Sequence, residues 1–275
     1  MNKIRKPVVA GFFYPSDSQK LSAEIKNFLS ISIPNIIPQK VFGIVSPHAG
    51  YFYSGHTAAF GYNIIKDKNY KTVIIISPSH REYFSGISIY EGNAFETPLG
   101  IVEINNDLAD SLTNGSKYIF RGVVGHKEEH AIEVQIPFLQ TVLNDFKIVP
   151  IVMGDQRKIF VDELAEKISE IFDNDTLVIA SSDLSHYHSK REAFELDSIV
   201  EQRIKDFDFE NLLFDLERRN CEACGGGPIV AMMEAAWFLN KKRAIILNRS
   251  DSGDVSGDNT QVVGYISAAV YGENV

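Results

Sequence analysis

The chain contains three short apolar runs, at residues 41–45, 73–76 and 177–180, each ended by serine or proline. The runs are rich in β-branched residues and show no alternation with polar positions. Such runs are typical of strands buried on both faces of a parallel sheet. Because proline cannot donate a hydrogen bond to a sheet ladder, we expect Ser77 and Pro78 to end the second strand.

Histidines follow all three runs. His48 comes after the first run, His80 after the second, and Asp183, His186 and His188 after the third. In open α/β sheets, ligands bind outside the carboxyl ends of the strands. If the three strands are parallel neighbours, their imidazoles converge on one edge. We interpret them as one site rather than as separate loop caps.

The remaining pattern alternates between helices and strands. Helical spacing predicts helices near residues 21–29 and 161–172 and two more within 194–216, whereas 146–153, 244–247 and 262–270 predict strands. Residues 86–104 resemble a hairpin excursion, and Pro228 opens a helix that is apolar nearly all round. We expect an α/β fold, a three-layer α/β/α sandwich with a largely parallel central sheet, as a single domain over 1–275.

Composition narrows the class of protein. The chain has 275 residues, 44% of them hydrophobic, so it can bury a full core. A net charge of −9 argues against a general nucleic-acid binder. No apolar run approaches the roughly 20 residues that span a bilayer, and the first residues lack the apolar core of a signal peptide. We therefore expect a cytoplasmic protein with no nucleic-acid or membrane partner.

Cys221 and Cys224 are the two cysteines. Two cysteines are too few for a disulfide framework. No second Cys or His pair follows at the spacing that a zinc knuckle needs. Redox chemistry of the two thiols remains an alternative role for the C-x-x-C pair. Cys224 precedes a glycine loop that opens a buried helix, whose positive end is expected to lower the thiol pKa. With His48 and His80 it makes a possible three-ligand metal site; alternatively, it is a small buried hydrophobe.

Two further groups of residues are candidates for catalysis or metal binding. Asp183 and His186 could orient a ligand or move protons, although Asp183 could instead cap a following helix. Residues 126–130 match the H-x-x-E-H motif of inverzincin zinc proteases. A proline soon interrupts that segment, so we favour a helix N-terminus that directs His130 and Glu133 toward the pocket.

Six segments, taken together, resemble the Memo family. In chain order they are AGFFYP at 10–15, SPHAGYFYSG at 46–55, SPSH at 77–80, EEHAIEVQIPFLQ at 128–140, SSDLSHY at 181–187 and CGGGP at 224–228. In prokaryotes this family is protein B of the AmmeMemoRadiSam gene set. The resemblance therefore implies AMMECR1-like and radical-SAM proteins as partners, besides an unknown small molecule or peptide.

The resemblance also implies a fold similar to class III extradiol dioxygenases and a cleft in which His48, His80 and Cys224 bind iron or copper. Zinc is a further candidate. The resemblance also assigns Asp183 and His186 to this cleft. We add His130 as a supporting catalytic residue. Ring-opening dioxygenases of this fold use two His and a Glu, so Cys224 is a departure.

We therefore expect a metal-dependent oxidoreductase of unknown substrate. The alternatives are a non-enzymatic module that binds a peptide or small molecule, in which Tyr51 and Tyr53 would matter more than a metal, and a true extradiol dioxygenase.

Overall fold

The computed structural model describes residues 3–272. Within them nine helices form: α1 (Ser18–Ile31), α2 (Tyr51–Ile65), α3 (Asn106–Thr113), α4 (Gln135–Val142), α5 (Lys158–Ile171), α6 (Lys190–Lys205), α7 (Phe209–Glu217), α8 (Gly226–Phe238) and α9 (Gly253–Ser256). The same residues form twelve strands: β1 (Ile4–Arg5), β2 (Val41–Ser46), β3 (Thr72–Pro78), β4 (Ile87–Tyr90), β5 (Ala94–Thr97), β6 (Gly100–Glu103), β7 (Ile119–Gly122), β8 (Lys147–Met153), β9 (Thr176–Ser181), β10 (His186–His188), β11 (Arg243–Asp251) and β12 (Val262–Tyr271).

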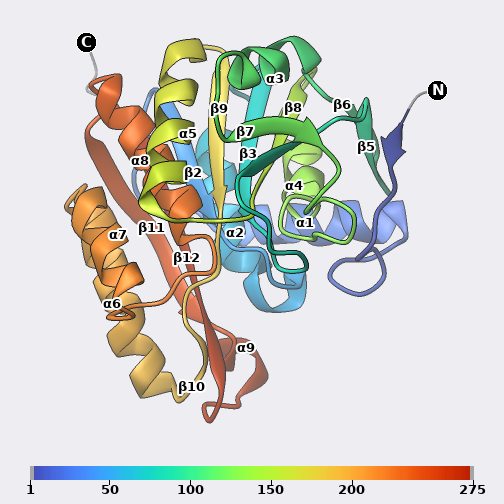
Figure 1. The fold of residues 1–275 in the computed structure, drawn as a ribbon. Helices are drawn as coiled ribbons and strands as arrows, with labels where there is room; N and C mark the ends of the chain where they lie inside the picture. Colours follow the sequence, from blue (N-terminus) through green and yellow to red (C-terminus); the bar gives the residue numbers. More distant parts are fainter. Residues whose placement is uncertain (1–2, 273–275) are drawn as a thin grey trace.

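A large mixed sheet runs through the centre of the molecule in the order β10-β12-β2-β9-β3-β8-β4-β7, with β11 paired to β12 (Figure 1). Its central strands β2, β9, β3 and β8 are parallel, whereas β12 and β4 join this block in antiparallel orientation. Strands β1, β5 and β6 form a separate small sheet. Helices flank the large sheet on both sides, so the predicted three-layer α/β/α fold is confirmed.

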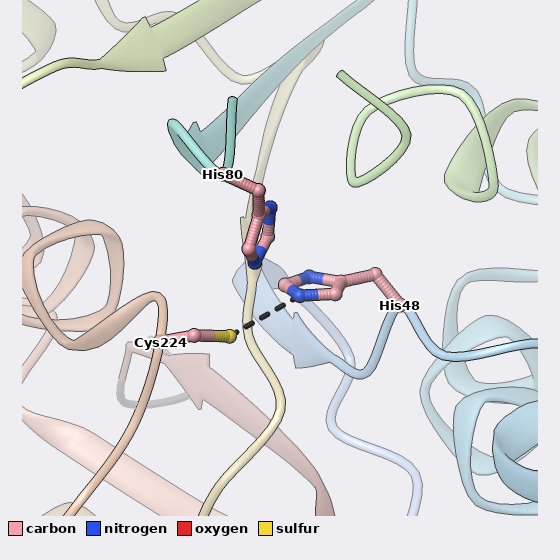
Figure 2. Close-up of side chains that lie close together, drawn as sticks. All are labelled: His48, His80 and Cys224. Atoms are coloured by element: carbon pink, nitrogen blue, oxygen red, sulfur yellow. Dashed lines mark hydrogen bonds between the residues drawn. The ribbon is translucent and has the colours of Figure 1, made fainter. Parts of the chain in front are cut away.

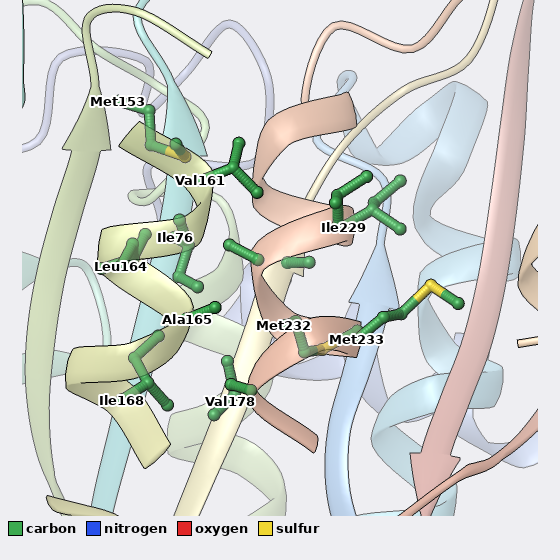
Figure 3. Close-up of a cluster of buried hydrophobic side chains, with 14 of the residues drawn as sticks. Ile76, Met153, Val161, Leu164, Ala165, Ile168, Val178, Ile229, Met232 and Met233 are labelled. Atoms are coloured by element: carbon green, nitrogen blue, oxygen red, sulfur yellow. The ribbon is translucent and has the colours of Figure 1, made fainter. Parts of the chain in front are cut away.

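The central strands are apolar throughout because each supplies two cores. In β3, Ile74 and Ile76 point into the core beneath α5 and α8, while Val73 and Ile75 point into the core beneath α1, α2 and α4. Figure 3 shows the first of these cores, in which Val161 and Ala165 of α5 point toward α8. Successive side chains of a strand alternate between faces, so a strand buried on both faces shows no polar positions.

Of two expectations about strand ends, the structure confirms one and corrects the other. Strand β3 ends at Pro78, as expected, and Pro78 pairs with Met153 of β8. Proline is tolerated there because it occupies the last position of the strand, where only one ladder donor is lost. The segment 86–104 is only partly a hairpin: β5 and β6 pair around Pro98, but β4 belongs to the large sheet. No helix within 3–272 is long and apolar enough to cross a bilayer.

Candidate metal centre

The site lies where the central strands end. Strand β9 separates β2 from β3, and all three are parallel, so their carboxyl ends share one edge of the sheet. His48 follows β2, His80 follows β3, and Cys224 lies in the loop just before α8. One ligand atom from each lies within 4.8 Å of the others (Figure 2). Cys224 Sγ is 3.2 Å from His48 Nε2.

Hydrogen bonds fix the orientation of the buried His48 ring. Its Nδ1 lies 2.9 Å from Ser181 Oγ, at the end of β9. The Ser181 hydroxyl donates to the carbonyl of Ala131 at 2.8 Å, and it also accepts from the Gln135 amide. Because the Ser181 hydroxyl proton is donated to Ala131, the Ser181 oxygen can only accept from His48. His48 Nδ1 therefore carries the ring hydrogen. The lone pair of Nε2 therefore faces Cys224 and is free to bind a metal.

Glu129 performs the same task for His80. Its Oε1 lies 2.9 Å from His80 Nδ1, and its Oε2 accepts from the backbone N–H of His80 at 2.7 Å. Burial alone would raise the pKa of Glu129, but hydrogen bonds from His80 and from the backbone N–H of Ala131 outweigh it and lower that pKa to about 2. A carboxylate on the second nitrogen of a histidine is the usual support of a metal ligand.

His130 lies in the same cluster. Its ring centroid lies 4.7 Å from that of His80 and 5.4 Å from that of His48, and its buried Nδ1 makes no hydrogen bond. His80, Glu129 and His130 form a second group whose ligand atoms lie within 4.8 Å of one another. Burial, helped by the neighbouring His48, lowers the pKa of His130 to about 4, and burial also lowers the pKa of His48. Both rings are therefore neutral, the form that binds metals.

Asp183 forms hydrogen bonds that link the loops carrying His48 and Cys224. Its Oδ1 accepts from the N–H of His48 at 2.8 Å, and its own N–H points to Cys224 Sγ at 3.2 Å. Burial raises the pKa of Asp183 in spite of the hydrogen bond from His48. It caps no helix, because α6 begins only at Lys190 with Ser189 as its cap. The structure thus places Asp183 at the site.

Cys224 differs from one expectation. Burial, together with the negative charge of Asp183, raises the pKa of its thiol, whereas the start of α8 had been expected to lower it. Desolvation is stronger here than the attraction of the helix end. A cation bound at the sulfur would reverse this balance, since a coordinating thiol is deprotonated.

A cavity of about 550 Å³ opens beside Cys224. His186 and Cys221 also line it, and Leu184 and Leu216 contribute apolar wall. His186 thus lines the same cavity as Cys224, although its side chain makes no hydrogen bond among residues 3–272. The cavity is large enough for a small molecule to reach the sulfur.

The H-x-x-E-H interpretation is wrong. His126 is buried away from the cluster and bonds the carbonyl of Ser88 at 3.0 Å. Residues 126–134 are not helical, since α4 begins only at Gln135, so His126 and His130 do not share a helical face. Glu133 was expected to face the pocket together with His130, but its carboxylate instead binds Arg5 at 2.7 Å.

The family of the chain follows from comparison with known proteins. A sequence model described as Memo-like protein matches residues 5–269. The chain belongs to the Memo family. The MEMO1 family protein TV1383 of Thermoplasma volcanium is 40% identical over 265 residues, covering 96% of this chain and 97% of the relative. A MEMO1 family protein of Methanosarcina mazei is 40% identical over 273 residues, 98% and 99% of the two chains.

A solved structure supports the fold of this Memo-family chain. The uncharacterized protein JW3007 from Escherichia coli K12 superimposes with a TM-score of 0.54 at 10% identity. The match covers 84% of this chain and 100% of the other. At that identity the likeness concerns the architecture alone.

Proposed function

We propose that this Memo-family protein binds one redox-active metal ion through His48, His80 and Cys224 and acts on a small molecule as a metal-dependent oxidoreductase. The observation that carries the proposal is the convergence of these three ligand atoms within 4.8 Å. Two neutral imidazoles and a thiol suit iron, copper and zinc, and the soft sulfur ligand favours a redox metal such as iron or copper.

The residues around the ligands have separate tasks. Ser181 and Glu129 hold His48 and His80 so that each presents Nε2 to the ion. The bound ion would supply Lewis acidity and electron exchange. The His130 ring is neutral, with Nδ1 3.5 Å from Glu129 Oε1, so the ring can accept a proton from a bound substrate. The substrate enters through the cavity beside Cys224, where His186 faces it.

A second candidate, extradiol ring cleavage, is favoured by one specific observation. His80, Glu129 and His130 also converge within 4.8 Å and offer two imidazoles and one carboxylate. That donor set is the one used by many non-haem iron oxygenases. Glu129 would then leave His80 Nδ1 to bind the ion. The non-enzymatic binding module has less support, because Tyr51 is buried and donates its hydroxyl to the carbonyl of Val134.

Metal analysis tests the proposal. Protein purified without oxygen from cells grown with ample iron and copper should contain about one ion per chain. His48→Ala and Cys224→Ser should each lose most of it, while His56→Ala, a histidine outside the site, should keep it. A fully loaded His48→Ala variant, or a metal-free wild type, would overturn the proposal.

A catechol assay separates the two candidate functions. Iron-loaded protein receives catechol without oxygen, and oxygen is then admitted. Ring-opened product that survives in Cys224→Ser but disappears in Glu129→Gln would favour the dioxygenase. Absence of such product in the loaded wild type removes that candidate and leaves the oxidoreductase proposal standing.

A further inference from the structure

A second polar site lies outside the metal centre, where α7 packs against α8 (Figure 1). Two neighbouring cavities of about 620 and 220 Å³ lie there. Phe209 and Glu210 of α7 and Glu234 of α8 line both cavities. The two cavities thus lie next to each other along α7 and share three lining side chains, and we refer to them together as the groove.

Glu234 is the one charged residue of α8, and it is only 9% exposed. Its carboxylate has no hydrogen bond and no ion pair with any residue in the described part of the chain. Burial, with a smaller contribution from Asp162, raises the pKa of Glu234 to about 7, against the weaker attraction of the Lys158 ammonium, which is already bound to Asp162. Burying a carboxylate without a partner is costly, so a cation that entered the groove would be bound favourably.

The other acidic groups differ in whether they are already paired. Lys158 binds both carboxylate oxygens of Asp162, at 2.7 and 2.8 Å. Asp208 is held by Arg203 at 2.7 Å. Glu210, like Glu234, has no ion pair within residues 3–272. Two unpaired carboxylates therefore face the groove from neighbouring helices.

Aromatic rings complete the lining. Trp237 and Phe238 of α8 are 45% and 47% exposed, and both lie along the larger cavity with Phe209. The ammonium of Lys242 already lies 4.5 Å from the centre of the Trp237 ring. Ring faces attract ammonium groups, so this surface suits organic cations. No cluster of three metal-ligating atoms occurs here among the described residues, which argues against a metal ion.

We propose that this groove binds an aliphatic diamine or polyamine. One ammonium pairs with the Glu234 carboxylate and a second with Glu210, while the methylene chain packs on Phe209 and Trp237. An elongated dication matches two separated carboxylates and two adjacent cavities better than a compact cation does. The inference does not depend on the metal centre.

Calorimetric titration of the full chain with putrescine and spermidine, at about 0.15 M salt, tests the proposal. Wild type should bind spermidine, and Glu234→Gln should weaken binding about tenfold or more, since it removes one charged hydrogen bond. Glu166→Gln is the matched control, because it removes an exposed carboxylate of α5 outside the groove. It should change the affinity less than twofold.

A second variant covers the aromatic half of the site. Trp237→Leu keeps both carboxylates and should still weaken binding several-fold through loss of the ring face. Circular dichroism checks that each variant is folded. Absence of spermidine binding at millimolar concentration, equal effects of Glu234→Gln and Glu166→Gln, or equally strong competition by Mg²⁺ would each overturn the proposal.

Discussion

The buried ion pair between Arg5 and Glu133 links the N-terminal arm to the segment that carries Glu129 and His130. The two side chains are 6% and 0% exposed, and Arg5 Nη1 lies 2.7 Å from Glu133 Oε2. The rest of the guanidinium donates to the backbone carbonyls of His126 and Glu129. The pair therefore holds a non-helical segment whose backbone would otherwise lack partners.

Glu133 also holds the arm itself. Its carboxylate accepts hydrogen bonds from the Tyr14 hydroxyl and from the backbone N–H groups of Val8 and Val9. Glu133→Gln keeps the shape but leaves the Arg5 charge buried without a counter-charge. Removing one member of a buried pair costs about 3–5 kcal/mol, a large part of the roughly 5–15 kcal/mol that stabilises a typical domain.

Urea unfolding followed by circular dichroism measures this cost. Glu133→Gln should lose about 3–5 kcal/mol of unfolding free energy. Arg5→Met combined with Glu133→Gln should recover part of it, because no lone charge remains and the Gln oxygen still accepts from the Tyr14 hydroxyl. The control is Glu91→Gln, which breaks the exposed pair with Lys3 and should cost less than about 1 kcal/mol. Equal losses in Glu133→Gln and Glu91→Gln would refute the reasoning.

Three further predictions concern single residues. Glu129→Gln should weaken metal binding about 10- to 100-fold in a chelator competition, and unchanged affinity would contradict its support of His80. Gly225→Ala should destabilise the fold by about 1–3 kcal/mol in urea, since a Cβ there would lie 2.2 Å from the Ser181 carbonyl oxygen; a neutral effect would contradict the packing. The raised pKa of Glu234, about 7, means that the folded state binds the extra proton between about pH 4.5 and pH 7, so stability falls as pH rises through that window. Glu234→Gln removes this decline and should gain up to about 3 kcal/mol by about pH 8, whereas a gain that is the same at pH 5 would contradict the assignment.

The strand-end histidines could be predicted because their strands are buried on both faces. In an α/β fold, a β-branched run such as 73–76 forms a central strand that is buried on both faces. His80 follows this run, so it lies at the carboxyl end of that strand. The order of the strands could not be read in the same way. That β9 lies between β2 and β3 depends on packing between residues more than a hundred positions apart, as in the pairing of Gly43 with Val178.

The residues that support the ligands were harder to identify. Glu129 stood in the sequence as a possible protease base, and its place beside His130 was the only signal that it faces the site. The sequence indicated only that Ser181 ends a strand, and nothing in it predicted the hydrogen bond to His48. The segment 126–134 resembled a helix by its apolar spacing, but Gly125, with φ of 78°, redirects the chain, and Arg5 takes the carbonyls that a helix would use. Long-range partners of this kind leave no local pattern.

X-ray absorption at the metal edge of zinc-loaded protein tests most directly whether two imidazoles and one thiolate hold the ion. The spectrum should contain one sulfur at about 2.3 Å and nitrogen ligands at about 2.0–2.1 Å, and the sulfur contribution should vanish in Cys224→Ser. A wild-type spectrum without sulfur, or a sulfur contribution that persists in Cys224→Ser, would contradict a site built from His48, His80 and Cys224.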